Sequence, residues 1–237
     1  MVSPRYKFLI IGAIIMTFFS CVSRRCHAQE KKTEKSSERF FGEASILTDY
    51  IRKGVTQTNH DPAFQTGVGY KFSPSFRLGI WGSNVNYEYE SVHLNLKTYF
   101  SYQFFMTANV NLLLRHDLDR YYKATSRNGT NTLLDLTLFS YHVLYVKDDN
   151  WEGTQTQSSW FAFRKEFPYS ASTAIEATAG YSMVDVDNYN NYIDLKAAYI
   201  YRENPIKLSA EITMTSNARQ FNGRGNMALA LQVATQF

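Results

Sequence analysis

Apolar and polar side chains alternate at every second residue through most of this chain beyond its first forty residues. In 191–201, for example, Ile193 and Leu195 alternate with Asp194 and Lys196. A period of two is that of a β-strand, whereas an amphipathic helix needs apolar residues three and four apart. The pattern therefore predicts an all-β protein in which each strand has one apolar and one polar face.

Twelve such strands are predicted. Their bounds are 42–54, 63–72, 76–85, 91–102, 107–116, 131–140, 142–149, 158–167, 173–183, 191–201, 206–215 and 226–237. The even count depends on a strand break near Tyr141, and single-chain bacterial outer-membrane barrels have even strand numbers. We expect the last strand, which ends on Phe237, to pair with the first near 44–53 and close the barrel.

Alternation alone does not distinguish a membrane barrel from a soluble one, because the two differ only in which face is turned inward. The chain contains 17 Tyr, 17 Phe and 3 Trp, a load typical of barrels with aromatic girdles at two membrane interfaces. The complementary face carries full charges in segment after segment, as expected for a wet lumen. These features favour a transmembrane antiparallel up-and-down barrel over a soluble periplasmic one.

The N-terminus predicts secretion. Arg5 and Lys7 precede the apolar run 8–19, which is shorter than the ~20 residues of a transmembrane helix and suits a signal peptide. We expect a signal peptide over 1–28, with cleavage before Gln29; lipoprotein processing at Cys21 is the alternative. A flexible polar lead-in, 29–39, and one barrel domain, 40–237, follow.

The mature chain differs from the precursor in cysteine content and charge. Both cysteines lie in the signal segment, so the mature chain has neither a disulfide framework nor a cysteine-ligated metal. Removing four bases from 25 leaves 21, against 21 acids. This balance gives no reason to expect nucleic-acid binding.

The connections between the predicted strands differ in length. Three of them, 73–75, 168–172 and 202–205, are short, whereas 117–130 and 216–225 are longer and polar. Short periplasmic turns and longer external loops are the usual asymmetry of outer-membrane barrels. We therefore expect both termini on the periplasmic side.

A motif near the start of the barrel resembles a known family. Ser45-Ile-Leu-Thr-Asp-Tyr-Ile-Arg-Lys-Gly-Val-Thr-Gln-Thr58 leads into Asp61-Pro-Ala-Phe-Gln65, and Leu78-Gly-Ile-Trp-Gly-Ser-Asn-Val85 follows. This arrangement resembles the TorF family of porins, although Lys53 intervenes before Gly54 and Thr56 replaces a serine. The resemblance is sharp over 44–85 and diffuse beyond. It implies an outer-membrane barrel that acts as a pore, and it carries over no catalytic residue. The motif residues are Asp49, Tyr50, Arg52, Gly54, Gln57, Thr58, Pro62, Ala63, Gln65, Trp81, Ser83 and Asn84.

Two interpretations of this motif remain open from the sequence. One is that it only specifies hairpin geometry, with Gly54 supplying a turn that needs positive φ. The other is that Arg52, Gln57 or Trp81 contacts a solute.

The inward faces of the predicted strands supply the pore-lining candidates. These are Lys71, Arg77, Trp81, Lys97, Arg115, Asp135, Arg164, Glu176, Asp194, Lys196 and Glu211. Charges of both signs could pair across a narrow barrel and plug it, or line an open pore as a transverse field. Twelve strands lie between the filled eight-stranded barrels and the aqueous channels of sixteen or more, so the sequence leaves both possibilities open.

The leading hypothesis is an outer-membrane porin that passes small polar solutes or ions by passive diffusion. The alternative is a non-conducting barrel that serves as a structural anchor or adhesin. The histidines share no metal-ligand spacing and no nucleophile–base pair is evident, so we expect no enzyme, metal or cofactor. The expected partners are outer-membrane lipid, small solutes and the barrel assembly machinery, which would bind the closing strand ending in Phe237.

Overall fold

The computed structural model describes residues 39–87 and 93–237. The predicted signal peptide and all but the last residue of the lead-in lie outside the described residues. Within them, no helix is long and apolar enough to cross a membrane.

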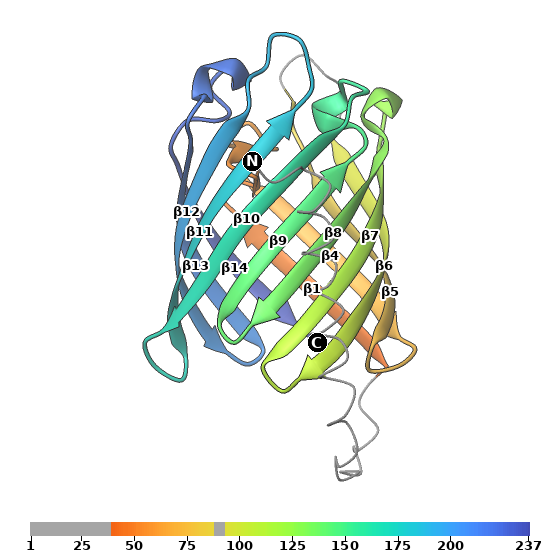
Figure 1. Ribbon diagram of the computed structural model, residues 1–237, viewed down its shortest axis with the longest axis vertical. Coiled ribbons are helices and arrows are strands. Elements are labelled where there is room, and N and C mark those ends of the chain that lie inside the picture. Colours follow the sequence, from red (N-terminus) through yellow and green to blue (C-terminus); the bar gives the residue numbers. More distant parts are fainter. Residues whose placement is uncertain (1–38, 88–92) are drawn as a thin grey trace, which may run out of the picture. The chain divides into compact units, whose positions relative to one another are not determined.

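Twelve antiparallel strands form a closed barrel (Figure 1). The wall strands are β1 (Phe40–Leu47), β4 (Ala63–Lys71), β5 (Phe76–Asn84), β6 (Leu94–Thr107), β7 (Val110–Tyr121), β8 (Gly129–Leu138), β9 (Tyr141–Asp148), β10 (Ser158–Pro168), β11 (Thr173–Val184), β12 (Tyr192–Glu203), β13 (Ile206–Thr215) and β14 (Ala228–Gln236). Each pairs with its neighbour in sequence, and β14 pairs with β1, so the predicted closure is confirmed. The predicted break near Tyr141 is also confirmed, since β8 ends at Leu138 and β9 begins at Tyr141.

The remaining elements are short and lie outside the wall. A two-stranded sheet, β2 (Ile51–Arg52) and β3 (Val55–Thr56), interrupts the connection from β1 to β4. Three 3-10 turns occupy other connections: η1 (Thr125–Arg127), η2 (Trp151–Gly153) and η3 (Ala218–Phe221).

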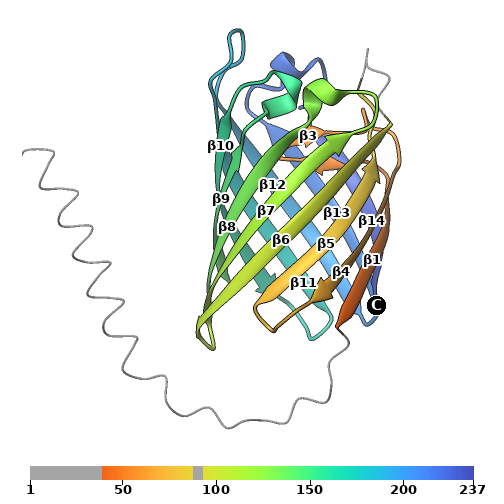
Figure 2. The ribbon, with the colours of Figure 1, turned by 90° about the vertical axis from the view of Figure 1, so that its right-hand side faces the viewer.

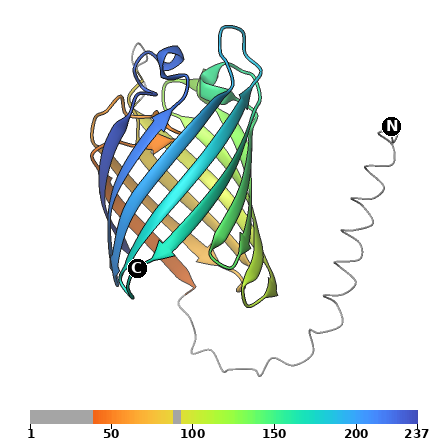
Figure 3. The ribbon, with the colours of Figure 1, turned by 60° about the vertical axis from the view of Figure 1, so that its left-hand side comes forward.

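The two ends of the barrel differ (Figures 1 and 3). The C-terminus, the start of β1 and the short hairpin turns lie at one end, here called the turn end. The 3-10 turns and longer connections lie at the other, the loop end. This confirms the expected length asymmetry; which end faces the periplasm remains a prediction.

The outer face of the wall is apolar, and the inner face is polar. Large side chains such as Ile46, Phe64 and Leu229 are 61%, 57% and 66% exposed on the outside. The register places Glu43, Gly67, Trp81, Lys97 and Asp119 side by side on the inside. A soluble barrel would hide its apolar set in the core, so this arrangement fits a barrel surrounded by lipid. Closure pairs the backbone groups of every wall strand, as lipid demands.

Several predicted strand boundaries are wrong, including the end of 91–102, because β6 continues to Thr107. The first strand does not reach Gly54, because the wall strand β1 ends at Leu47 and the chain then turns into the barrel. The hairpin β2–β3 has the same period of two as a wall strand, so alternation could not distinguish them. Lys53 and Gly54 both have positive φ, at 51° and 76°, as a two-residue type I′ turn requires.

Another error concerns the predicted loop 117–130. Strand β7 continues to Tyr121 and β8 begins at Gly129, so the loop is much shorter. The charged stretch is strand because its inward acids have partners inside the barrel: Asp117 pairs with Arg115, and Asp119 with Lys97. A charged inward face is normal in a wet or ion-paired lumen.

Candidate functional site

Residues 48–62, the inward segment, fold into the loop end of the barrel (Figure 2). Backbone and hydroxyl groups of Thr48 first bond to Leu231 of β14, at 3.0 and 2.9 Å. The hairpin tip then lies against β12 and β13, where a Cβ on Gly54 would come within 2.5 Å of Thr215 and 2.8 Å of Asp194. Together with its positive φ, this close approach explains why the tip residue is glycine.

Asp49 organises the inward segment from within. Its carboxylate accepts hydrogen bonds from the hydroxyls of Thr56 and Thr58, the latter at 2.9 Å. The ring Nδ1 of His60 lies 3.0 Å from the other carboxylate oxygen. Asp49, Thr56 and Thr58 are all buried, and buried polar groups are stable only when they are paired in this way. The motif aspartate therefore fixes the shape of the segment.

Asp148, at the loop end of β9, holds the hairpin tip. Its two oxygens receive Arg52 Nη2, at 2.6 Å, and Lys53 Nζ. Burial disfavours the charged form of Arg52, but Asp148 together with Asp119 and nearby tyrosines outweighs this and holds the pKa of Arg52 well above its ordinary value. The side chains of Asp148 and Lys53 are only 7% and 9% exposed, so this ion pair is largely screened from water.

The inward segment also packs against the loop-end connections. Gln57 donates to Glu152 at 3.4 Å and accepts from Tyr87 at 2.7 Å. Arg224 binds both the carbonyl of Thr56, at 3.2 Å, and Glu152, at 3.1 Å. Burial would raise the pKa of Glu152, but Arg224 and Arg127 reverse this and lower it.

An apolar cluster that includes residues of the loop-end connections covers the inward segment. Val55 packs with Trp151, Tyr192 and Phe221, and all four are at most 4% exposed. Trp151 and Phe221 come from two different loop-end connections, so burying Val55 joins the hairpin to both. Aromatic burial of this kind contributes the largest apolar areas available to a chain.

The later part of the motif clamps the return to the wall. The side chain of Asn84 donates to the carbonyl of Pro62 at 2.9 Å and accepts from the backbone of Phe64 at 2.6 Å. Asn86 donates to Asp61 at 2.8 Å. Ala63, Gln65 and Ser83 lie beside this clamp on the inner face, where the register pairs Gln65 with Ser83. These motif positions thus set where the inward segment re-enters the wall.

Trp81 faces the inward segment rather than open lumen. Its ring meets Tyr50 edge to face with centroids 5.8 Å apart, and Lys97 Nζ lies 5.8 Å from it on the other side. Lys97 is in turn fixed by Asp119 at 2.8 and 2.9 Å. Burial raises the pKa of Tyr50 to about 12. One pocket between the inward segment and the loops, lined by Arg52, Gln57 and Tyr87 among others, has a volume of about 20 Å³, which is room for about one water.

Below the inward segment, a connected set of acids and bases, with His142 of β9 among them, extends from β8 to β13. Asp135 binds His142 at 2.9 Å and Arg164 at 3.1 Å. Glu176 lies 4.0 Å from Arg164 and 2.9 Å from Lys196, which approaches Glu211 at 3.8 Å. We call this set, from β8 to β13, the charged wall. Its cations Arg164 and Lys196 are 29% and 31% exposed, so water reaches them.

The inner surface formed by β14, β1 and β4 carries fewer charges, Glu43 and Lys71 among them. The inward positions of β14, β1 and β4 include Ala230, Gln232, Ser45, Gln65 and Gly67. A solute beneath the inward segment would therefore meet ion pairs along β8 to β13 and mostly small neutral groups along β14, β1 and β4.

All eleven predicted pore-lining residues lie on the inner face, but they divide into three groups. Trp81, Lys97 and Asp194 contact the inward segment or the residues that hold it; Asp194 accepts from Trp160 at 2.7 Å and lies against Gly54. Asp135, Arg164, Glu176, Lys196 and Glu211 form the charged wall. Lys71, Arg77 and Arg115 lie nearer the turn end, outside that wall. Sequence reasoning missed Asp148, Glu152 and Arg224, although Asp148 continues the inward alternation of β9.

One family matches most of the sequence. A sequence profile described as "Bacterial protein of unknown function (Gcw_chp)" matches residues 31–229. The chain belongs to the Gcw_chp family. This description does not name the TorF family, and no curated protein sequence matches this Gcw_chp protein at a significant level.

Several solved porin structures are similar to this chain in fold. The KdgM porin shares 9% identity with this Gcw_chp protein at a TM-score of 0.54, covering 84% of this chain and 98% of that one. The KdgM porin in complex with disordered oligogalacturonate shares 11% identity at a TM-score of 0.54 with the same coverage. The NanC porin shares 8% identity at a TM-score of 0.52, also with the same coverage. At these identities the likeness shows a porin-type β-barrel fold and extends neither to the location nor to the solute.

Proposed function

We propose that this protein is an outer-membrane pore of the TorF type, through which small polar solutes or ions diffuse passively. The observation that carries this proposal is the charged wall, which places ion-paired but water-accessible charges on the inner face of β8 and of β10 to β13. Charge lining a wet lumen is the usual device for passing polar solutes while limiting which ones enter. The porin-type fold and the apolar outer face support the location.

In this proposal the inward segment is the constriction. It places Tyr50, Arg52 and Gln57 across the loop end, and the buried pair of Arg52 and Lys53 with Asp148 keeps it there. Solutes would pass beside the segment or when it is displaced. Both termini would face the periplasm, the loop end would face outward, and β14 with Phe237 would be the strand recognised by the assembly machinery.

Planar-bilayer recording of the refolded mature protein tests the pore. We expect discrete conductance steps. Where electrostatic contacts between an added solute and the charged wall contribute, that solute should block the current less at high salt. The absence of steps at every voltage would reject the pore. Surface labelling of single cysteines placed at Asp187 and Ser170 tests the orientation: on intact cells, only the loop-end position at 187 should react.

A second candidate, a non-conducting barrel, is favoured by one specific observation. The inward segment is held by buried ion pairs and an apolar cluster, and one pocket beside it has room for only about one water. If wild-type protein does not conduct but a variant without the segment does, the native barrel is a closed scaffold.

A further inference from the structure

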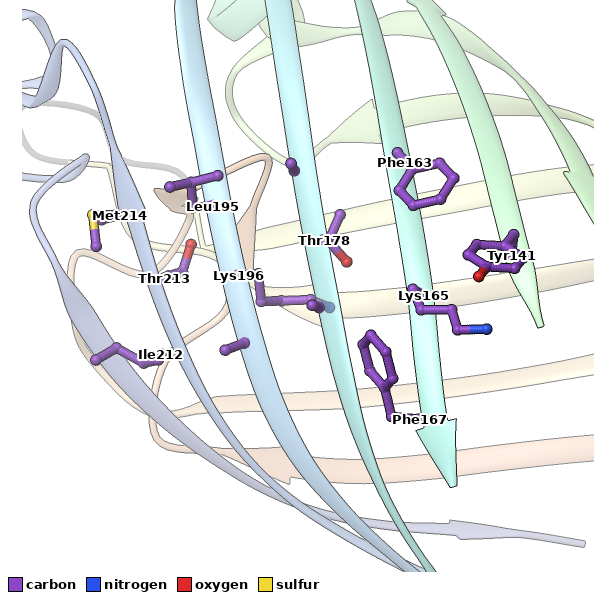
Figure 4. A pocket seen from close by; sticks show the side chains of 13 residues that line it. Tyr141, Phe163, Lys165, Phe167, Thr178, Leu195, Lys196, Ile212, Thr213 and Met214 are labelled. Atoms are coloured by element: carbon purple, nitrogen blue, oxygen red, sulfur yellow. The ribbon is translucent and has the colours of Figure 1, made fainter. Parts of the chain in front are cut away.

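A groove of about 460 Å³ lies on the outer face of the barrel, over strands β10 to β13 (Figure 4). Its floor comes from Ala177, Ala179 and Ala197, whose small side chains sit between larger neighbours. Phe163 and Leu195 are among the apolar side chains that border it. The lining is almost entirely apolar, and it belongs to the surface that lipid would surround.

Strand register explains why the groove exists. Lys165, Ala177, Ala197 and Ile212 pair directly across four strands. Elsewhere on the same strands, outward positions carry large residues such as Tyr199. Alanines at adjacent positions therefore leave a trough, and an unfilled trough in a bilayer would forfeit dispersion contacts along its whole length.

One cation stands at the edge of this trough. Lys165 is half-buried on the outer face, with its ammonium 3.6 Å from the ring centroid of Tyr141 and in contact with the hydroxyl of Ser140. Among the ion pairs of the described residues, none joins Lys165 to a carboxylate. Lys165 lies near the turn end of β10, where a lysine reaches the headgroup level by snorkelling.

We propose that this groove binds one glycerophospholipid with an anionic headgroup, its acyl chain over the alanines and its phosphate at Lys165. The inference rests on the proposed membrane location. Charge complementarity selects the occupant, because an acyl chain fills the trough and a phosphate supplies the anion that the lysine lacks. A second copy of the chain fits less well, since a two-fold contact uses the same patch on both subunits and would bring two unneutralised lysines together.

The test uses the full mature chain in a non-ionic detergent. Thermal unfolding is followed after addition of phosphatidylglycerol or phosphatidylcholine with identical acyl chains, and native mass spectrometry counts bound lipid. We expect phosphatidylglycerol to raise the melting temperature more than phosphatidylcholine does, with one retained lipid per barrel.

Two variants, each with a matched control, locate the site. Lys165→Met should abolish the preference for phosphatidylglycerol, whereas Lys147→Met, at another outward lysine, should leave it. Ala177→Phe should fill the trough and abolish retention of either lipid. Ala44→Phe, on the outer face of β1 away from the groove, should not. The melting temperature without lipid shows whether each variant is folded.

An unchanged headgroup preference in Lys165→Met, or unchanged retention in Ala177→Phe, would overturn the proposal. So would a dimer in native mass spectra that forms without lipid and is lost in Ala177→Phe. Conductance is measured separately: Lys165→Met should conduct like wild type. A barrel that fails to conduct but still binds lipid at Lys165 would reject only the pore.

Discussion

The two halves of the lumen use the same chemistry in opposite surroundings. At the loop end, Lys53 and Asp148 are paired with side chains that are 9% and 7% exposed. Nearer the turn end, the paired Lys196 is 31% exposed. The inward segment causes this difference, because it excludes water from the Lys53–Asp148 pair and leaves Lys196 accessible to water. An ion pair at the loop end therefore acts as a fastener, whereas one in the charged wall is available to a solute.

Removing the inward segment breaks this contrast most completely. Replacing residues 50–59 by a short Gly-Ser linker should open the loop end and raise single-channel conductance several-fold, because the hairpin no longer crosses the lumen. Planar-bilayer recording measures it. The same linker placed in the turn 169–172 is the control and should leave conductance unchanged. Equal conductance in both variants would show that the segment does not limit flow.

Asp148→Asn removes only the ion pairs that Asp148 makes with Arg52 and Lys53. It leaves Arg52 and Lys53 without their carboxylate in a largely buried site, and breaking a buried ion pair costs about 3 kcal/mol or more. The segment should undock more often, so trypsin should cleave after Arg52 or Lys53 and conductance should fluctuate. Asp187→Asn, at an exposed loop aspartate, is the matched control. Wild-type protease resistance in Asp148→Asn would mean that the apolar cluster around Val55 suffices.

Lys196→Gln tests the water-accessible charged wall. The change leaves Glu176 and Glu211 with less compensating charge, so the lumen becomes more negative and should favour cations. The reversal potential under a salt gradient should shift toward that of the cation, with the mean conductance little altered. Lys147→Gln removes an outward lysine and should have no such effect. A shift of equal size in both variants would assign it to overall charge.

Alkaline pH provides the smallest and most specific test. Burial raises the pKa of Tyr50 to about 12, above the ordinary value of about 10. The folded segment therefore favours the neutral phenol, and its docking is fully stable below pH 10 and weakens as pH rises toward 12. Protease sensitivity should increase over this range in wild type. Tyr50→Phe, which retains the ring against Trp81, should lose that component.

The barrel could be predicted from the sequence because its wall depends on a local signal. Alternation in segments such as 191–201 places Asp194 and Lys196 on one face whatever their distant partners are. The inward segment could not be predicted in the same way. The hairpin Ile51–Thr56 alternates as a wall strand does, and its course depends on contacts with Asp148 and Arg224, far along the chain.

The motif resemblance compensated for part of this gap. It identified Asp49, Gly54 and Asn84 as special, and the structure gives each a physical role in shaping or anchoring the inward segment. It did not identify Glu152 or Asp148, which lie outside the motif. A buried acid is recognisable only when the cations that neutralise it are placed beside it.

The bonds between Thr48 and Leu231 join residues 183 positions apart, and Arg224 reaches Thr56 across 168. The segment is made early, yet its partners are among the last parts of the barrel to be synthesised. Contacts of such separation form late, since the intervening chain must first be ordered. The loop end is therefore completed only when β14 pairs with β1. Barrel closure and docking of the inward segment thus belong to the same step of assembly.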